Sequence, residues 1–407
     1  MAAGWPPAIS LLLLLALLLP VTASSMVLPL FGNVYPVGHF YVAVGIGEPV
    51  KPYFLHIDTG SNLTWVECHA DGGSCNKCNT VPHPLYRATQ NKRVPCADAR
   101  CASLHQDVGK PKNCGAAPQT CNYEIQFLEG SSSRGMLVHD KFSILPKSNA
   151  HAADIAFGCG YEQVEASGRN EKVQVDGVLG LGRGSIDLVS QLKQLKVIAK
   201  NTIGHCLSYK GGGFLIIGKD MSTFPLKKWA PMAPGQPRYY SPGRATLHLD
   251  ARSIGGADPV EVILDSGSTY TYLPNALHKQ LVPVLQATLR KSLQVVKDPS
   301  LPGELCWKRP EKFRSVDDLK KEFKPVMSFN FGNEVTMAIP PENYLVVTKQ
   351  GNACFGIFAH NAKYIILGDI TMQGLLVIYD NDRKQLGWVR ADCNKPPKSI
   401  SAITSRI

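Results

Sequence analysis

After residue 25, the sequence has no stretch that is long and apolar enough to span a bilayer, and no long low-complexity tract that would favour disorder. The run Leu11–Leu19 is unbroken but too short to cross a membrane, and Pro20 and small residues follow it. This order is typical of a signal peptide, so we expect residues 1–25 to be removed and the mature protein to have no stable membrane association. An uncleaved anchor is the alternative, because the first ten residues lack Lys and Arg.

Basic clusters are missing as well. The net charge of +11 comes from Lys and Arg that are scattered along the chain, without a basic run or interleaved aromatic residues. A nucleic-acid-binding protein usually has such a cluster, so we expect no nucleic acid partner. A basic exported protein instead meets acidic wall polysaccharides or anionic surfaces by non-specific attraction.

Metal and nucleotide motifs are also absent. The eleven histidines form no HExxH pattern and no Ser-His-Asp order, and GLGRGS at 180–185 lacks the Lys of a phosphate-binding loop. Cys75 and Cys78 have zinc-type spacing with His69 and His83 nearby, but no second CxxC follows. We therefore expect no metal and no organic cofactor, with a zinc site as the minor alternative.

The chain does contain twelve cysteines, an even number, and eight of them lie between Cys68 and Cys159. Behind a signal peptide, an even count indicates disulfides formed in an oxidising compartment. We expect a secreted protein of the cell wall or extracellular space, with the vacuole as another possible destination.

The length of 407 residues favours two domains, and 44% hydrophobic with 18% charged residues suits a globular chain with a sizeable core. Short β-branched and aromatic runs predict strands, and we expect an all-β fold; the clearest runs are 39–47, 214–218, 261–267 and 375–380. A few short helices should begin at Ser185, Asn275 and Ser315, the last with Asp318 in a capping box. Proline and glycine between 225 and 242 mark a boundary, which divides the chain into lobes 26–230 and 231–407.

One pattern occurs twice. The segment HIDTGSNLTWV spans 56–66, and ILDSGSTYTYL places its acid at the same point in 263–273, 207 positions later. A later apolar and glycine-containing segment follows each, DGVLGLG at 176–182 and IILGD at 365–369. A single Asp-Thr-Gly is an ordinary turn, but two in matching places of an ordered pattern indicate an internal duplication.

A duplication with approximate two-fold symmetry would bring Asp58 and Asp265 together at the interface of the two halves. Two close carboxylates cannot both ionise cheaply, so they share a proton and titrate as a pair. A water between them then loses a proton to the ionised acid while the protonated acid polarises a peptide carbonyl. This chemistry hydrolyses an amide without a covalent intermediate.

The neighbours of the two acids fit the same arrangement. The first residue after each acid locks the loops together, the glycine permits close backbone approach, and the last hydroxyl holds the outer carboxylate oxygen. These supporting residues are Thr59, Gly60, Ser61, Ser266, Gly267 and Ser268.

With these two signatures and the two glycine segments, the chain after residue 25 resembles the pepsin-like aspartic proteases over nearly its whole length. The strings NVYPVGHFYVAVGIGEP, FGCGY, GGGF, YYSPG and SAITSRI are similar to the plant nucellin-like branch. The resemblance implies a bilobal all-β fold and a monomeric endopeptidase for extended polypeptides, with apolar residues preferred beside the cut. It also implies that Trp65 lies behind a flap, and that disulfides join Cys206 to Cys393 and Cys306 to Cys354.

Pairing in the first half stays open beyond a first assignment of Cys96 to Cys101.

The segment 121–145 alternates cleanly, with Tyr123, Ile125 and Phe127 on one face, and then turns through Gly130 and Ser131 to Gly135. This predicts a hairpin with a mobile tip, the flap of the resembling family, or else a surface hairpin of no consequence. Phe127 stands where the family has a tyrosine, so it keeps the hydrophobic wall but lacks the hydroxyl for a bond toward Trp65. In another register, Tyr123 takes that place.

Two further expectations concern modification and latency. Asn62-Leu63-Thr64 is a formal glycosylation sequon, but inside the acidic turn a structural role is favoured over a glycan. The expected first strand begins near His39, which leaves little room after Ser25 for the pro-segment that the family carries, so we expect no cleavable plug.

Two rival functions remain at this stage. A non-catalytic pepsin-fold binding or inhibitor protein of the plant cell wall is favoured by Phe127 and the short N-terminal segment, and disfavoured by the retention of both aspartates. A disulfide-bonded lectin or structural wall protein is the other rival. Fold alone does not decide among them.

Overall fold

The structure is a computed structural model, and it describes residues 25–69, 81–111, 114, 119–127, 130–144, 152–164, 175–222, 224, 226, 228–301 and 304–396. Two predictions fall outside these ranges. They are the expected signal peptide at residues 1–25, of which only Ser25 is described, and the pair Cys75 and Cys78.

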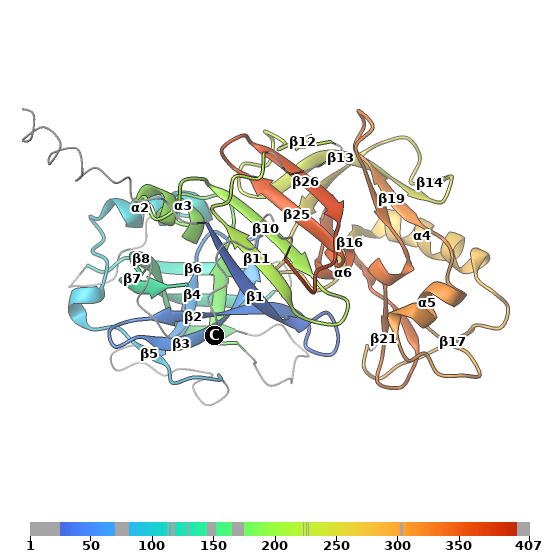
Figure 1. Cartoon of the computed structure of the whole chain (residues 1–407), viewed down its shortest axis with the longest axis horizontal. Helices are drawn as coiled ribbons and strands as arrows, with labels where there is room; N and C mark the ends of the chain where they lie inside the picture. The colour runs from blue at the N-terminus through green and yellow to red at the C-terminus, as the bar shows by residue number, and fades with distance from the viewer. Residues whose placement is uncertain are drawn as a thin grey trace, which may run out of the picture.

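The described part of the chain is mainly β-sheet, as the sequence predicts, and its largest sheet has 14 strands (Figure 1). The strands of this sheet are β1 (Met26–Asn33), β2 (His39–Ile46), β3 (Lys51–Asp58), β4 (Trp65–His69), β5 (Tyr86–Arg87), β6 (Asn122–Gln126), β7 (Ser132–Ser143), β8 (Ala153–Val164), β9 (Gly177–Gly180), β10 (Thr202–Leu207), β11 (Gly213–Ile217), β12 (Ala230–Pro231), β25 (Leu375–Asp380) and β26 (Gln385–Arg390). Alternating burial along β2 shows why these residues form strands: Phe40, Val42 and Val44 enter the core while Tyr41 does not.

The second half of the chain forms two smaller sheets within the described residues. One contains β13 (Tyr240–Leu249), β14 (Arg252–Ile254), β15 (Val260–Leu264), β16 (Thr271–Pro274), β19 (Met327–Asn330), β20 (Thr336–Ile339), β23 (Ile357–His360) and β24 (Ile365–Leu367). The other contains β17 (Gln294–Val296), β18 (Cys306–Lys308), β21 (Leu345–Val347) and β22 (Ala353–Phe355). The predicted strand at 261–267 therefore ends at Leu264, because the turn begins with the acid that follows it.

The strand that carries each acidic turn pairs in parallel with the later apolar segment of its own half. In the first half β3 pairs with β9, which sets Asp58 beside Gly180. In the second half β15 pairs with β24, which sets Leu264 beside Leu367. The two-part repeat seen in the sequence is therefore a repeated pair of parallel strands.

The end of the chain returns to the first half. Strand β25 pairs antiparallel with β10, and β26 pairs antiparallel with the other edge of β25, so the order in this part of the sheet is β26-β25-β10-β11 (Figure 1). The disulfide between Cys206 and Cys393 ties the same region together. The sheet thus crosses the expected boundary near residue 230.

Five α-helices lie among the described residues, together with short 3-10 helices at Gln90–Lys92 and Pro341–Asn343. The α-helices are α2 (Ala99–Val108), α3 (Leu188–Gln194), α4 (Asn275–Thr288), α5 (Val316–Glu322) and α6 (Asp369–Met372). The helix expected from Ser185 begins later, because Asp187 is the N-cap and its carboxylate accepts hydrogen bonds from Val189 N and Ser190 N. Asn275 is the first residue of α4 rather than its cap.

Ser315 is the N-cap of α5, but the expected capping box is not formed. The Ser315 side chain makes no cap hydrogen bond, and the Asp318 carboxylate accepts from Arg314 N at 3.0 Å instead of from Ser315 N. The helix is instead held by Leu319, which is buried in the main core.

Five disulfides join described cysteines, and the pairs Cys206–Cys393 and Cys306–Cys354 are those that the resemblance implied. The assignment of Cys96 to Cys101 is wrong. Cys101 lies on the buried face of α2 and pairs with Cys121, which directly precedes β6, while Cys96 pairs with Cys114. The remaining described pair is Cys68–Cys159.

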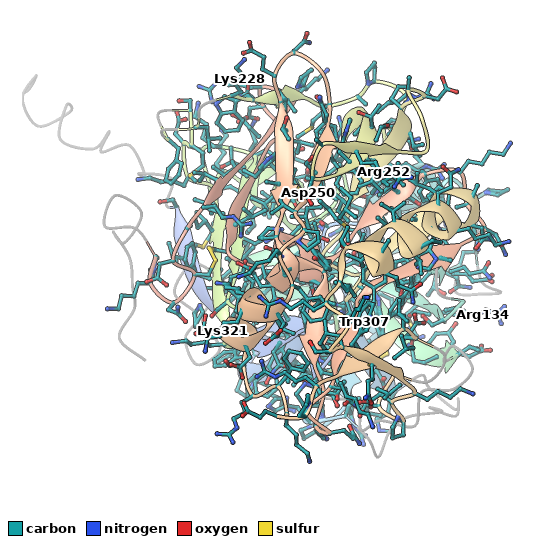
Figure 2. All side chains as sticks on the ribbon, turned by 90° about the vertical axis from the view of Figure 1, so that its right-hand side faces the viewer. Arg134, Lys228, Asp250, Arg252, Trp307 and Lys321 are labelled. Carbon is teal, nitrogen blue, oxygen red and sulfur yellow. A yellow bond between two sulfur atoms is a disulfide. The ribbon has the colours of Figure 1, made fainter. Side chains whose placement is uncertain are left out.

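No helix among the described residues is long and apolar enough to cross a membrane. The basic side chains labelled in Figure 2, Arg134, Lys228, Arg252 and Lys321, lie at separate places on the surface, as their scatter in the sequence suggests.

Candidate active site

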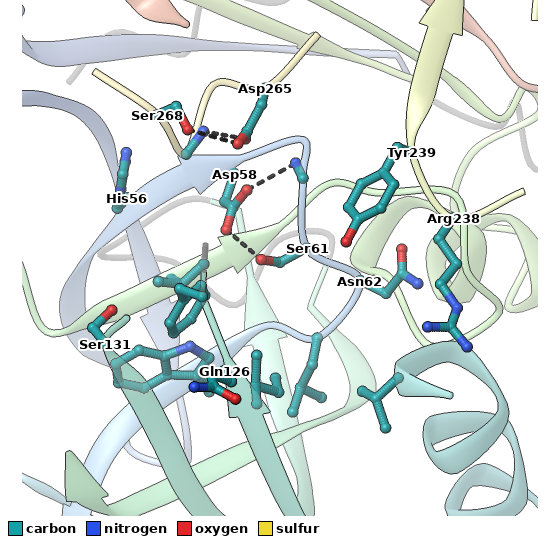
Figure 3. Close-up of a pocket in the computed structure, with 18 of the residues that line it drawn as sticks. His56, Asp58, Ser61, Asn62, Gln126, Ser131, Arg238, Tyr239, Asp265 and Ser268 are labelled. Atoms are coloured by element: carbon teal, nitrogen blue, oxygen red, sulfur yellow. Dashed lines mark hydrogen bonds between the residues drawn. The ribbon is translucent and has the colours of Figure 1, made fainter. Parts of the chain in front are cut away.

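Each acidic turn holds its carboxylate by bonds within the turn. Gly60 N donates to Asp58 Oδ1 at 2.8 Å, and the Ser61 hydroxyl donates to Asp58 Oδ2. The second turn repeats this arrangement, with Gly267 N donating to Asp265 Oδ1 at 2.8 Å and the Ser268 hydroxyl to Asp265 Oδ2 at 2.8 Å. These bonds are drawn in Figure 3.

The hydroxyl residues next to the acids connect the two turns. The Thr59 hydroxyl donates to Leu264 O at 3.3 Å, and the Ser266 hydroxyl donates to Ile57 O at 3.0 Å. Both residues are fully buried, and each also accepts a hydrogen bond from the other's backbone N–H. Buried bonds of this kind fix the position of one turn relative to the other.

The glycines lie against the opposing carboxylates. A Cβ on Gly60 would lie 2.6 Å from Asp265 Oδ1, and a Cβ on Gly267 would overlap Asp58 Oδ1. Each turn therefore places its backbone over the acid of the other, and only glycine leaves room for this approach.

Electrostatics couple the two acids. Burial raises the pKa of Asp58 well above its usual value, and the Asp265 carboxylate, which shares a hydrogen bond with it, raises this pKa further. The bonds from Ser61 and Gly60 lower it in part. A pair of this kind keeps a proton where an isolated aspartate would be ionised.

A third acid, Asp369, interacts electrostatically with the two acids of the turns. Asp369 is the first residue of α6, is fully buried, and neither carboxylate oxygen has a hydrogen-bond partner among the described residues. Burial, followed by the charges of Asp265 and Asp58, raises its pKa well above the usual value. The IILGD segment therefore supplies a third buried acid, close enough to the pair for the charges of Asp265 and Asp58 to raise its pKa.

A cleft of about 390 Å³ opens over the two acids. Its lining includes both acidic turns, the strand β6 with Phe127, the end of α2 and the loop before β13. The size and the partly apolar lining are those of a ligand site, and the open form suits an extended chain.

The predicted hairpin is present but turns earlier than expected. Phe127 N donates to Ser131 O at 2.9 Å, and Gly130 has a φ of 94°, so the turn lies between Phe127 and Ser131. Gly135 lies within β7, opposite Tyr123. A turn at Gly130–Gly135 is therefore a wrong prediction, because Ser132 to Gly135 already pair with β6.

Phe127 and Ser131 line the cleft, whereas Tyr123 is fully buried and its hydroxyl contacts the Ser133 hydroxyl at 3.0 Å. Trp65 also lines the cleft, and its Nε1 has no hydrogen-bond partner among the described residues. Of the two aromatic residues considered for the flap position, Phe127 is therefore the one at the cleft, and it has no polar group that could bond to the indole of Trp65.

Several residues of the cleft were not among the predicted site residues. They are His56, Val108, Lys110, Arg238 and Tyr239, which come from β3, from the end of α2 and from the loop before β13. Arg183 Nη1 donates to Tyr239 O at 3.1 Å and holds that loop in place. Only the fold brings these segments to one cleft.

Asn62 has a structural role. Its Oδ1 accepts from Gly184 N at 3.0 Å, and its Nδ2 donates to Asp107 O at 3.5 Å, so the sequon lies within a bonded loop beside the cleft. This supports the preference for a structural asparagine over a glycan.

Among the residues that the structure describes, one group has the composition of a metal site, namely Cys101, His105 and Cys121. Its two sulfur atoms are joined in a disulfide, so they are not available as thiolate ligands. His83, which belongs to the minor zinc alternative in the sequence, has its Nδ1 2.8 Å from the Asp176 carboxylate.

Comparisons with known proteins agree with this architecture. Family models described as xylanase inhibitor N-terminal and xylanase inhibitor C-terminal match residues 40–219 and 243–390. An aspartic proteinase of Oryza sativa subsp. japonica is 45% identical, over 98% of this chain and 98% of that protein. Aspartic proteinase 39 of Arabidopsis thaliana is 28% identical, over 92% of this chain and 79% of that protein.

Among solved structures, basic 7S globulin from soybean is similar, with a TM-score of 0.68 and 17% identity over 91% of this chain and 96% of that one. Conglutin gamma from lupine seeds has a TM-score of 0.67 and 16% identity, over 92% and 96%. These two structures bear on the fold alone.

Proposed function

The chain belongs to the pepsin-like aspartic proteinase family, and on that premise we propose that it is an endopeptidase that cleaves polypeptides with Asp58, Asp265 and an activated water. The observation that carries this proposal is the mutual approach of the two turns, in which each glycine lies against the carboxylate of the other. The supporting roles of Thr59, Ser61, Ser266 and Ser268 follow from their hydrogen bonds.

The reaction begins with one of the two acids ionised and the other protonated. The ionised acid takes a proton from a water between them, and the oxygen of that water attacks the carbonyl carbon of the peptide. The protonated acid donates a hydrogen bond to the carbonyl oxygen, where negative charge develops. Collapse of the tetrahedral intermediate breaks the C–N bond, and the leaving nitrogen takes up a proton from the pair.

The pH dependence follows from the shared proton. At high pH the pair loses its proton and the carbonyl is no longer polarised, so activity falls. We therefore propose an optimum below neutral pH. Because the pKa of Asp58 is raised, the pair keeps its proton, and the enzyme its activity, to a higher pH than the usual pKa of an aspartate would allow.

We further propose that residues 1–25 are a signal peptide and that the mature enzyme is a secreted monomer. We propose that residues 26–230 and 231–407 form its two lobes, with β25 and β26 of the second lobe crossing into the sheet of the first. Five disulfides among the described residues support a route through the secretory pathway. The final location, whether cell wall, extracellular space or vacuole, is part of the proposal.

The experiment is a pH series with the purified mature chain and a denatured protein substrate, with and without a statine-type transition-state mimic. We expect cleavage below neutral pH that the mimic inhibits and that Asp58→Asn or Asp265→Asn abolishes, with the fold unchanged by circular dichroism. Full activity in either variant contradicts the mechanism.

A binding protein without catalysis is the second candidate. Two observations favour it: the matched family models are described as xylanase inhibitors, and Phe127 leaves Trp65 Nε1 without a partner among the described residues. It predicts no cleavage at any pH, together with inhibition of a xylanase by the intact protein.

A further inference from the structure

A second cavity of about 120 Å³ opens beside the main cleft. The two cavities share His56, Trp65, Phe127, Ser131 and Val178 in their linings. In Figure 3, His56 and Ser131 lie on one side of Asp58, and Arg238 lies on the other. The side pocket therefore opens from the His56 end of the cleft, next to the proposed catalytic pair.

Two side chains of this pocket carry buried N–H groups without partners among the described residues, namely Gln163 Nε2 and Trp65 Nε1. Gln163 is 7% exposed and Trp65 is 8% exposed, so bulk water does not satisfy these donors. A buried donor left without a partner is unfavourable, because it has lost its hydrogen bonds to water and gained none in the fold. A ligand that accepts hydrogen bonds at this place recovers part of that cost.

The fold keeps room for the glutamine amide. Gln163 lies on β8 opposite Ser133 of β7, behind the flap hairpin. A Cβ on Gly160 would lie 2.5 Å from Gln163 Nε2, so glycine at that position leaves space for the amide group.

The other residues of the pocket restrict which acceptor can enter. Glu67 lines the pocket and is only 4% exposed, which disfavours a carboxylate because like charges repel in a buried site. An ammonium group offers only donors and leaves Gln163 and Trp65 unpaired. An aliphatic side chain fits the walls made by Val178 and Phe127 but also leaves both donors unpaired.

A side-chain amide suits this lining, because its oxygen accepts from the two N–H donors and its NH2 group is compatible with a nearby carboxylate such as that of Glu67. We propose that this pocket is a specificity pocket that takes a glutamine or asparagine side chain of the substrate. The inference rests on the proposed protease function, and it replaces the expected apolar preference at one substrate position.

The test uses a pair of statine-containing peptides and a pair of cleavable peptides. Within each pair, one peptide has Gln and the other has Leu at a single position. This position is varied in turn among those near the cut. At one position we expect the Gln peptide to bind and to be cleaved about tenfold better, which corresponds to about one hydrogen bond. Gln163→Leu should lower binding and cleavage of the Gln peptide about tenfold and so remove this preference. Gln294→Leu, the same change on the exposed strand β17, should keep the preference.

Binding is measured also with Asp58→Asn, so that the result does not depend on turnover, and thermal unfolding confirms that each variant is folded. If the Gln and Leu peptides are bound and cleaved equally well at every position, the pocket holds only water. This result overturns the inference but leaves the proposed protease function in place. A retained Gln preference in folded Gln163→Leu also overturns it. Absence of both cleavage and statine-peptide binding overturns the inference together with the proposed function.

Discussion

Thr59 and Ser266 exchange hydrogen bonds across the interface of the two acidic turns: Thr59 N donates to Ser266 Oγ at 3.1 Å, and Ser266 N donates to Thr59 Oγ1 at 2.9 Å. The two residues are 207 positions apart in the chain, and both are fully buried. This reciprocal pair sets the separation of the two acids, so its loss affects stability and activity together.

The first prediction concerns this exchange. Thr59→Val keeps the shape of the side chain but removes the acceptor for Ser266 N, and we expect it to lower the free energy of unfolding by about 1–3 kcal/mol. Denaturant unfolding measures the change, and kcat should fall as the acids separate. Thr336→Val on the exposed face of β20 is the control, with a change of at most about 0.5 kcal/mol. Equal effects of the two substitutions would contradict a special role for Thr59.

The second prediction concerns the glycines. Gly60→Ala and Gly267→Ala each place a methyl group against the carboxylate of the other turn, so we expect kcat to fall by about 100-fold through displaced geometry. Gly235→Ala is the matched control, because a Cβ there has no atom within 4 Å. A normal kcat in the Gly60 or Gly267 variant shows that the close approach is not needed.

The third prediction concerns the flap. Phe127→Tyr adds a hydroxyl next to Trp65, whose Nε1 lacks a partner among the described residues, and we expect kcat/KM on peptides without an amide side chain to rise up to about tenfold. The same change takes a donor from the side pocket and should reduce the Gln preference. Phe127→Leu serves as the comparison, since it removes the ring without adding a hydroxyl. No gain from tyrosine over phenylalanine contradicts this account of the flap.

The fourth prediction concerns Asp369. Because its pKa is raised in the fold, the acid stays protonated there but ionises in the unfolded chain above about pH 4, so it lowers stability as pH rises. Asp369→Asn has no such loss. The difference in the free energy of unfolding between variant and wild type should therefore change by up to about 1.4 kcal/mol per pH unit.

Denaturant midpoints of wild type and variant at several pH values between about 4 and 7 provide the measurement. His205, whose pKa burial lowers to about 3, acts in the opposite direction, and comparison of the two proteins cancels its contribution. Asp317→Asn, at an exposed carboxylate of α5, is the control. Parallel curves for wild type and Asp369→Asn would show that Asp369 ionises in the fold.

The acidic turns were predictable because their bonds are local: Asp58 is held by Gly60 and Ser61, which follow it directly in the chain. The hairpin strands β6 and β7 were predictable for a similar reason, since alternation along Asn122–Gln126 fixes the buried face on which Tyr123 lies. The position of the turn was not, because pairing of β6 with β7 extends to Ser132.

Features that depend on distant segments had no local signal. Cys101 forms a disulfide with Cys121 because α2 packs beside β6. Ser185 N donates a hydrogen bond to the distant Asp107 carboxylate instead of beginning a helix. Arg238 and His56 reach one cleft through the packing of the two halves. The return of β25 to β10 likewise depends on the whole fold.

The central claim is that Asp58 and Asp265 hold one proton between them. The direct measurement is a titration of their carboxyl 13C chemical shifts, assigned with Asp58→Asn and Asp265→Asn. We predict that the pair still carries one proton at about pH 6, where an isolated aspartate is ionised. Two fully ionised carboxylates at that pH would contradict the claim.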